Sequence, residues 1–400
     1  KTIRKMKKNL RVPYGLSVHG KEEINSVIKV LKTSTQMGKN VYEFEKKIAK
    51  LFDKKYGLMV NSCSSANLLA LSALNLPKGS EIITPCLTFS TTISPIIQLG
   101  LIPSLVDINL DTLLINEDCI EEMITKKTRA MIIPNLIGNI PNLIKIKKIC
   151  KKYNLYFIED SADTIDSFYS NKRSGSYSDI STTSFYASHV ITCAGSGGML
   201  CTNNEKFYKK ALIQRGWGRN STLFGENEDV KYRFKSKKSY DEKYLFTDLG
   251  YNFIPTEISA AFGLEQLKKL KKLALNRKKN FKILHNFFSK NKKYFKVPSI
   301  NKKIDNIWLA FPLLVNTKKF TRNELQIFLE KNNIQTRTIF TGNIMKQPGY
   351  INQKFKKNKF GYSNSDYVME NGILLGCHQS MKKKEIEYMI FKVNEFLEKY

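Results

Sequence analysis

The chain has 400 residues, of which 66 are Lys or Arg and 35 are Asp or Glu, so its formal net charge is +31. Hydrophobic residues make up 42% of the chain, a fraction typical of a globular protein, and the length allows two domains. No apolar run is long enough to span a bilayer and none follows the basic first residues, which predicts a cytoplasmic protein with no membrane partner.

The excess of positive charge does not by itself indicate a nucleic-acid partner. Lys residues are scattered along the chain, and short runs such as "KKLKKLALNRKK" are typical of solvated helix faces. We therefore expect no nucleic-acid partner, although the charge favours an anionic substrate. The seven Cys residues form no CxxC pair, which argues against a structural metal site.

The first half of the chain alternates between predicted helices and strands. Residues 22–53 have a helical pattern with a loop at "STQMGKN", and the strand "YGLMVNS" is followed by the helix "SANLLALSALNL". The strands "SEIITP", "IPSLVDI", "RAMIIPNLIG" and "LYFIED" and the helix "LIKIKKICKKYN" continue the alternation. This pattern predicts an α/β fold with a mostly parallel sheet covered on both faces, and ligands at the carboxyl ends of its strands.

A smaller C-terminal α+β domain is predicted after a long basic helix that follows "GYNFIPTEISAAFGLEQLKKL" and ends near residue 291. The segments "KVPSI", "IWLAFPLLV" and "IQTRTIF" are predicted strands, and "TRNELQIFLEKNN" is a predicted helix. We place the boundary near residue 275, so that residues 1–275 form the large domain and residues 276–400 the small one.

Polar residues gather where the predicted strands end. In "NSCSSAN" small hydroxyl residues begin a helix, whose free N–H groups favour a phosphate, although N-capping alone would also explain them. Asp160 ends the buried strand "LYFIED", where a carboxylate must be paired or bind a cation, and Asp163 follows three residues later. Asn252 lies in "GYNFIPTE", a loop before a helix.

His189 stands in a segment that lacks cations. Residues 174–205 contain neither Lys nor Arg, which predicts that the segment is buried or chemically constrained. In "TTSFYASHV", Ser184 closes a strand and His189 follows five residues later. A lone His is more often structural than catalytic, but the Gly-rich, cation-free surroundings also suit acid/base chemistry.

Taken in order, these motifs resemble the DegT/DnrJ/EryC1 family of sugar aminotransferases and dehydratases, which use pyridoxal 5'-phosphate (PLP). The similarity runs from "YGLSVHGKEEI" through "VNSCSSANLLALSAL", "IEDSAD" and "SFYASHVITCAGSGGML" to "GYNFIPTEISAAFGLEQL" and "GCHQ", and so covers nearly the whole chain. The resemblance implies the PLP-dependent aspartate-aminotransferase fold, fold type I.

The resemblance also implies which residues hold the cofactor. Asp160 would pair with the pyridinium nitrogen, Asp163 would approach the phenolic oxygen, and Phe89 would stack on the ring face. The phosphate would be held by the backbone at Cys63 and Ser64 and the hydroxyl of Ser184. Asn252 would reach the phosphate of the neighbouring subunit, which implies a homodimer with shared active sites.

The aminotransferases of this family have at the position of His189 the lysine that binds PLP covalently, so non-covalent binding is implied here. Histidine at this position marks a subgroup, the 4-keto-6-deoxy sugar 3-dehydratases. In these enzymes L-glutamate converts PLP to pyridoxamine 5'-phosphate (PMP), and the C3 hydroxyl of a nucleotide sugar is then removed with the histidine as acid/base. The product implied is a 3,6-dideoxy-4-keto sugar. A related branch carries an iron–sulfur cluster on cysteines after a "WGR"-like element, but "GWGRNSTLFGENEDVKYRF" contains no Cys, so no cluster is expected.

By the same resemblance the sugar nucleotide, expected to be a GDP-sugar, is bound by residues that match the family's substrate positions. Three of them differ from the family's residues, with Ile254 in place of arginine, Gln335 in place of glutamate and Arg215 in place of histidine. These changes favour a variant hexose or a heptose, or they are neutral drift. The substrate-binding positions are Thr33, Ser34, Thr35, Gln36, Arg215, Arg219, Ile254 and Gln335.

Two alternatives stay open at this point. The protein could be a nucleotide-sugar aminotransferase with its lysine elsewhere, against which the cation-free segment argues. It could also be a non-catalytic ligand-binding homologue, which would predict loss of the other cofactor positions, whereas Asp160, Ser184 and Asn252 are all present.

Overall fold

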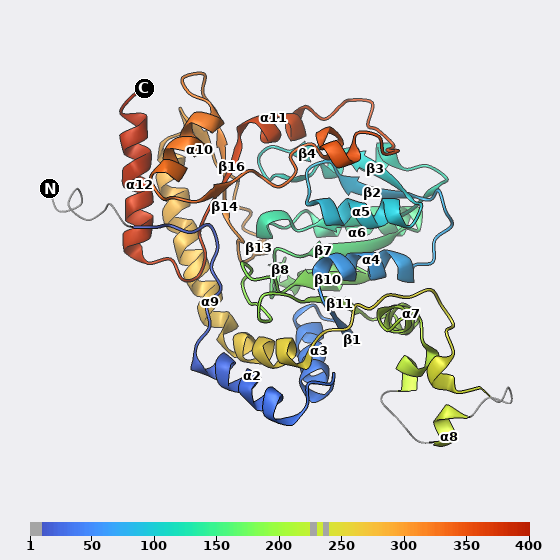
Figure 1. The fold of residues 1–400 in the computed structure, drawn as a ribbon. Helices are drawn as coiled ribbons and strands as arrows, with labels where there is room; N and C mark the ends of the chain where they lie inside the picture. The colour runs from blue at the N-terminus through green and yellow to red at the C-terminus, as the bar shows by residue number, and fades with distance from the viewer. Residues whose placement is uncertain (1–9, 225–229, 235–239) are drawn as a thin grey trace.

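The computed structural model describes residues 10–224, 230–234 and 240–400 (Figure 1). Its central element is a seven-stranded sheet with the strand order β1-β11-β10-β7-β6-β2-β3. Only β11 runs antiparallel to its neighbours, so the predicted mostly parallel sheet is confirmed, although β11 itself was not predicted. The strands are Tyr56–Val60 (β1), Glu81–Pro85 (β2), Ile102–Val106 (β3), Thr128–Pro134 (β6), Tyr156–Ser161 (β7), Ile180–Ser184 (β10) and Gly198–Thr202 (β11).

Helices cover both faces of this sheet, because successive strand residues point to opposite sides. In β1, Leu58 packs into a core cluster with α4 and α7, whereas Met59 packs into another with α3. The cation-free segment predicted to be buried supplies β10 and β11 in the interior of the sheet. The helices of this part are Lys21–Thr33 (α2), Lys39–Leu51 (α3), Cys63–Ala73 (α4), Ser90–Gln98 (α5), Leu143–Tyr153 (α6), Glu205–Arg215 (α7) and Val230–Arg233 (α8).

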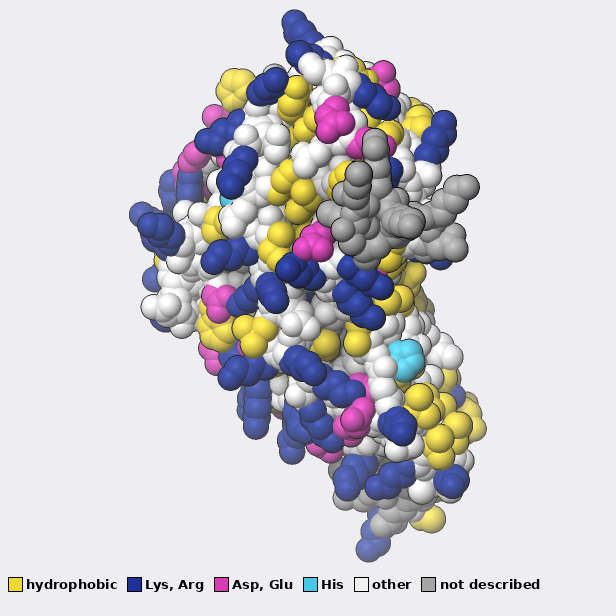
Figure 2. All heavy atoms as spheres, turned by 90° about the vertical axis from the view of Figure 1, so that its left-hand side faces the viewer, with side chains coloured by type: hydrophobic (Ala, Val, Ile, Leu, Met, Phe, Trp, Pro, Cys, Tyr) yellow, Lys and Arg dark blue, Asp and Glu magenta, His cyan; other side chains and the backbone are white. Residues whose placement is uncertain are grey.

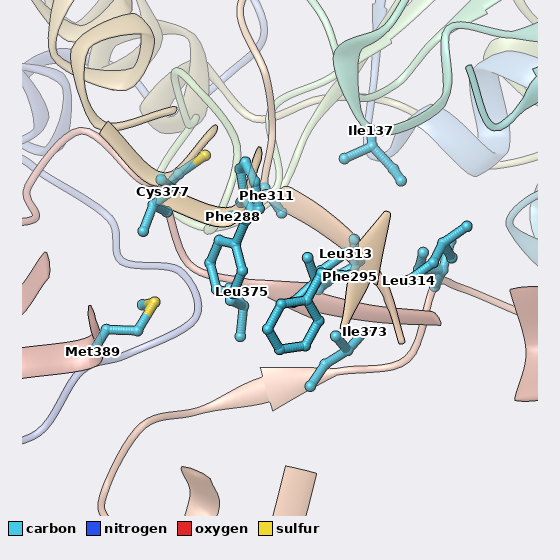
Figure 3. Close-up of a cluster of buried hydrophobic side chains, with 14 of the residues drawn as sticks. Ile137, Phe288, Phe295, Phe311, Leu313, Leu314, Ile373, Leu375, Cys377 and Met389 are labelled. Atoms are coloured by element: carbon cyan, nitrogen blue, oxygen red, sulfur yellow. The ribbon is translucent and has the colours of Figure 1, made fainter. Parts of the chain in front are cut away.

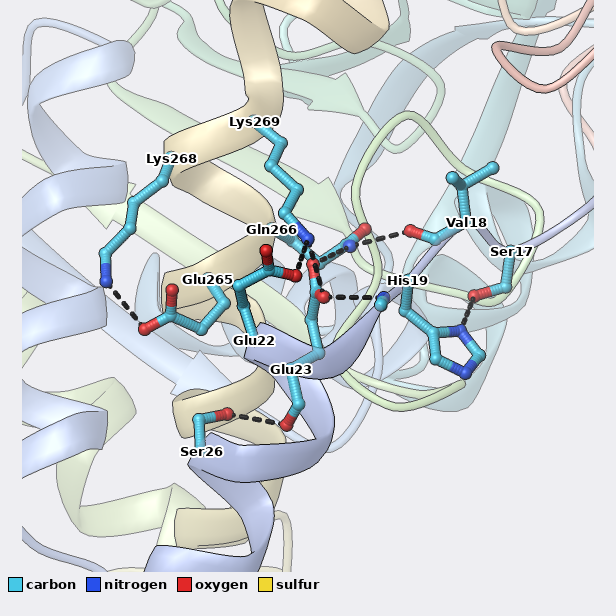
Figure 4. Close-up of polar contacts among 11 residues, drawn as sticks. Ser17, Val18, His19, Glu22, Glu23, Ser26, Glu265, Gln266, Lys268 and Lys269 are labelled. Carbon is cyan, nitrogen blue, oxygen red and sulfur yellow. Dashed lines mark hydrogen bonds and ion pairs between the residues drawn. The ribbon is translucent and has the colours of Figure 1, made fainter.

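Helix α2 is joined to the long helix α9, Glu257–Lys290, by a buried polar cluster (Figure 4). The carboxylate of Glu23 is fully buried and accepts hydrogen bonds from Lys269 Nζ (2.7 Å), Gln266 Nε2 (2.7 Å) and the Gly20 amide (2.8 Å). A buried carboxylate with three donors, one of them cationic, fixes the position of α2 against α9.

The C-terminal part has a four-stranded antiparallel sheet of order β12-β14-β16-β15. Its apolar side chains, with those of α9 and α12, form the largest buried cluster (Figure 3). Val12 pairs with Ile334, so the chain's first described residues pack against this part as well. The elements are Phe295–Lys296 (β12), Phe311–Val315 (β14), Thr336–Arg337 (β15), Gly372–Leu375 (β16), Arg322–Lys331 (α10), Ser363–Asn371 (α11) and Lys383–Leu397 (α12).

Helix α9 begins at Glu257 and continues without a break past residue 275, where the sequence suggested a domain boundary. Its first half packs on α2 and α3, and its second half contributes Phe281, Leu284 and Phe288 to the C-terminal core. The helix is therefore shared by both parts. Two short sheets complete the fold, formed by Ile108–Asn109 (β4) with Leu114–Ile115 (β5), and by Ile304–Asp305 (β13), Phe168–Tyr169 (β8) and Lys172–Arg173 (β9).

The surface carries the positive charge in a dispersed form. On the face in Figure 2, Lys and Arg side chains are spread widely with Asp and Glu among them, rather than gathered in one stripe. Within the described residues, no helix has both the length and the apolarity that a bilayer crossing requires.

Candidate active site

A cavity of about 370 Å³ lies where β7 and β10 end and α4 begins. It is lined from both parts of the molecule, because Leu309 and Phe340 contribute beside the residues of the large sheet. Of the lining residues that the structure describes, none is Lys or Arg. Asn252 is not on this lining. The other six of the seven residues expected from sequence at the cofactor lie on it together with His189: Cys63, Ser64, Phe89, Asp160, Asp163 and Ser184.

Asp160, in strand β7, is 3% exposed, and its carboxylate accepts from Cys63 Sγ at 4.0 Å and through three shorter hydrogen bonds. Thr92 Oγ1 and Asn67 Nδ2 donate to its Oδ2 at 2.8 and 2.9 Å, and the Ala162 amide donates to its Oδ1 at 3.1 Å. Burial raises the pKa of Asp160 despite these bonds. The carboxylate is thus held rigidly in a site that supplies no cation from the described cavity lining.

Asp163 presents a second carboxylate to the cavity. The Ile137 amide donates to its Oδ2 at 2.7 Å, while burial, with a smaller effect from the charge of Asp160, raises its pKa to about 7. Ile137 has a φ of 60°, which is unfavourable for a β-branched residue, so the donor is held in a strained conformation by its surroundings.

The start of α4 forms a cradle of N–H groups beside the cavity. Ser62 caps the helix by accepting from the Ser65 amide at 3.2 Å, and the amides of Cys63 and Ser64 lie in the first turn, where no helical acceptor exists. A Cβ on Gly198 would lie 2.3 to 2.4 Å from the Ser62 and Cys63 backbone. Glycine there allows β11 to approach the helix start, which is a suitable site for an anion.

Phe89 precedes α5 and is 52% exposed although it lines the cavity. Its ring makes an edge contact with Phe340, with 5.9 Å between the centroids. A large apolar ring left open to a cavity can stack on a planar ligand.

His189 lies in the loop after β10, on the cavity wall. Burial, followed by the positive charge of Arg277, lowers its pKa to about 4, and a hydrogen bond to the Ala162 backbone only partly opposes this. The imidazole is therefore neutral at pH 7, with one ring nitrogen hydrogen-bonded and the other able to accept a proton.

The expected substrate positions are not on the cavity lining of this chain. Thr33 ends α2 and residues 34–36 follow it; all four are exposed, as is Asn252, whose backbone pairs with Gly216. The guanidinium of Arg219 lies over the Trp217 ring, with 4.5 Å to its centroid, and its Nε is buried without a hydrogen-bond partner. Ile254 is half-buried.

Gln335 lies closer to the cavity, because its Oε1 accepts from the amide of the lining residue Tyr14 at 3.2 Å. Arg215, also expected at the substrate, is paired within the chain. Its side chain is 5% exposed and donates to Glu45 Oε1 and the Met59 carbonyl, both at 2.9 Å. This buried pairing points its guanidinium toward Glu45 in the protein interior.

Several lining residues were not anticipated from the sequence. The side chains of Asn67 and Thr92 donate to Asp160. On α4, Asn67 lies three residues after the predicted site residue Ser64, and at the start of α5, Thr92 lies three residues after Phe89. That helical spacing was a usable signal. Tyr14 gave no such signal, since it reaches the cavity from the chain's first described segment.

Comparison with known proteins identifies the family. The model of the DegT/DnrJ/EryC1/StrS aminotransferase family matches residues 18–394. The lipopolysaccharide biosynthesis protein RfbH of Salmonella typhimurium is 35% identical over 88% of this chain and 84% of its own. The GDP-4-keto-6-deoxy-D-mannose 3-dehydratase of Yersinia pseudotuberculosis is 32% identical over 94% of this chain and 97% of its own.

Solved structures agree with the sequence comparison. A mutant GDP-4-keto-6-deoxymannose-3-dehydratase with bound GDP-perosamine superposes with a TM-score of 0.86 at 31% identity, covering 96% of this chain and 100% of that one. The same enzyme with a trapped PLP-glutamate geminal diamine gives 0.85 at 31% identity over 95% and 99%. This chain therefore belongs to the DegT/DnrJ/EryC1/StrS aminotransferase family, PLP-dependent sugar-modifying enzymes of fold type I, as its motifs indicated.

Proposed function

We propose that this protein is a PLP- and L-glutamate-dependent nucleotide-sugar C3-dehydratase. It would remove the C3 hydroxyl of a GDP-linked 4-keto-6-deoxy hexose or heptose and give a 3,6-dideoxy-4-keto sugar. The observation that carries this proposal is His189, a neutral imidazole on a cavity wall without lysine among the described lining residues. The similarity to proteins named 3-dehydratases supports it.

The residues present fit PLP. Asp160 is a buried carboxylate without a cationic partner on the described lining, which suits a protonated ring nitrogen. The amides of Cys63 and Ser64 and the hydroxyl of Ser184 would hold the phosphate, and Phe89 would cover the ring. When bound, PLP supplies an electron sink that stabilises negative charge at an adjacent carbon.

The chain's own contribution to the reaction is orientation and proton transfer. Thr92 and Asn67 hold Asp160, so the ring would be oriented by a fixed carboxylate. His189 would take up a proton on the ring nitrogen that does not contact Ala162 and return it as the hydroxyl leaves. In the whole cycle, L-glutamate becomes 2-oxoglutarate as PLP becomes PMP, and PMP returns to PLP as the C3 hydroxyl is replaced by hydrogen with release of ammonia.

A homodimer with shared active sites belongs to the same proposal. Asn252 and residues 33–36 are exposed and away from the described lining of their own chain, which is the placement expected of residues that complete a neighbouring site. Arg219, Ile254 and Gln335 would then bind the sugar nucleotide.

The first test is spectroscopic. Protein reconstituted with PLP is mixed with L-glutamate, and we expect the aldehyde absorbance band to convert to the pyridoxamine band with stoichiometric 2-oxoglutarate. The PMP form is next offered GDP-, CDP- and dTDP-linked 4-keto-6-deoxy sugars, with ammonia release as the readout and His189→Asn as the matched control. Ammonia with the GDP-sugar supports the proposal.

The outcomes separate the alternatives. An amino sugar product without ammonia would make the protein a nucleotide-sugar aminotransferase. Bound cofactor with no response to L-glutamate would instead favour a non-catalytic ligand-binding homologue.

A further inference from the structure

Arg277 is a cation buried behind the candidate active site. It lies in the run "KKLKKLALNRKK", which the sequence suggested was a solvated helix face, yet its side chain is among the largest that are fully buried. No carboxylate pairs with it within the described residues; its hydrogen bonds go to neutral oxygens. Burying a cation without a counter-charge is costly, so its position requires an explanation.

The guanidinium contacts the loop that carries His189. Its Nη2 donates to the Ser188 carbonyl at 2.9 Å, and its Nε donates to Gln379 Oε1 at 2.6 Å. Gln379 Nε2 in turn lies 3.4 Å from the Val190 carbonyl and 3.5 Å from that of His189. Arg277 and Gln379 thus hold the backbone on both sides of His189.

The other two bonds of Arg277 anchor this arrangement to the C-terminal part. Its Nη1 donates to the carbonyls of Leu309 at 2.5 Å and Trp308 at 3.3 Å, and Leu309 itself lines the cavity. The guanidinium fork therefore joins α9, the His189 loop and the cavity wall, a geometry that a lysine ammonium could not reproduce.

The charged and titratable groups around His189 come from several elements. Asp160 and Asp163 line the same cavity beyond β7, Tyr14 lines it from the first described segment, and the Tyr186 ring lies 6.1 Å from the imidazole. Arg277, on α9, is the group whose charge opposes protonation of the imidazole. The charge of Arg277 acts in the same direction on His378.

We propose that Arg277 and Gln379 are positioning residues for His189, which fix its loop through the adjacent carbonyls and place an uncompensated positive charge beside that loop. This inference rests on the acid/base role of His189 in the proposed function. It does not depend on which sugar is the substrate.

The NMR test uses the 400-residue chain without cofactor, in which four His residues have to be distinguished by their labelled rings. Gln379→Glu adds a carboxylate beside Arg277 with almost no change of shape, and Arg277→Gln removes the charge. In either variant we expect the titration midpoint of His189 to rise by about one pH unit. Arg277→Lys keeps the positive charge, so the titration midpoint of His189 should stay near its original value. The variant loses the forked hydrogen bonds of the guanidinium, so conversion of bound PLP to PMP by L-glutamate should slow about tenfold.

His285, which contacts the Pro298 carbonyl at 3.2 Å, is the internal reference and should not shift. An unchanged His189 midpoint in a folded Gln379→Glu or Arg277→Gln protein overturns the proposal. A His189 midpoint that shifts as far in Arg277→Lys as in Arg277→Gln overturns it as well. The NMR result stands even if no dehydratase activity is found, so failure of this inference can be distinguished from failure of the proposed function.

Discussion

Replacing Asp160 by Asn tests whether the cavity was built for a positively charged ring. The change removes the charge and keeps the size of the side chain, and the amide oxygen can still accept from Thr92 and Asn67. Removal of one partner from a buried ion pair costs about 3–5 kcal/mol. We therefore expect the Kd of PLP to rise by roughly 150-fold or more.

The cofactor-free protein should respond in the opposite direction. Burial raises the pKa of Asp160 above its value in the unfolded chain, so the stability linked to this group is complete below the unfolded pKa and is lost as the pH rises through the folded one. At pH values above that folded pKa, the ionised Asp160 is a cost to the folded state. Asp160→Asn without cofactor should accordingly unfold at an equal or higher temperature than the parent protein.

Absorbance titration of PLP measures the Kd, and thermal unfolding with and without PLP measures the stability of each form. Asp163→Asn is the matched control, because it removes a carboxylate from the same cavity and leaves Asp160 intact. A variant that binds PLP as tightly as the parent, or that is less stable than the parent without PLP, would refute the assignment of Asp160 as the partner of a cation.

Three further outcomes are expected. Because burial raises the pKa of Asp163 from 3.8 to about 7, the cofactor-free protein should lose up to ~4 kcal/mol of stability between pH 4 and pH 7, and Asp163→Asn should lack this loss in urea unfolding. Burial raises the pKa of Glu23, but the hydrogen bond from Lys269 outweighs this effect and the pKa is lowered. Glu23→Gln should therefore destabilise the folded protein by about 2–3 kcal/mol at neutral pH and by progressively less below pH 4. Arg215→Met should destabilise by about 3 kcal/mol, with partial recovery when Glu45→Gln is added and no change in the KM of the sugar nucleotide; a raised KM with unchanged stability would return Arg215 to the substrate site.

The sheet could be predicted from the sequence because its strands are runs of apolar residues that follow helices. The strand β11 was harder to predict. It lies between β1 and β10 and pairs antiparallel with both, and its pairing with β1 joins segments that are far apart in the chain. The absence of cations from residues 174–205 correctly indicated burial, because an unpaired charge in a sheet interior is unfavourable.

The site could be predicted only where a motif fixes the direction of a side chain. Asp160 lies near the end of β7 and His189 follows β10; these strands end at the same sheet edge, and both residues reach the cavity. Arg215 ends a helix, and its position in the sequence did not show that it turns inward to Glu45. Arg277 was hidden for a similar reason, since one face of a basic helix can be buried while its neighbours remain solvated.

The distribution of charge decides what the cavity can bind. The chain has 66 Lys and Arg residues, but none is on the described lining, whereas Asp160 and Asp163 both are. An anion at the start of α4 would therefore be held by neutral N–H and hydroxyl donors, close to carboxylates that oppose it. With His189 neutral, the described lining supplies no positive charge to offset Asp160. A ligand with a phosphate but no cationic centre would leave an ionised Asp160 uncompensated, so we expect the cavity to favour a ligand that brings its own positive charge together with its phosphate.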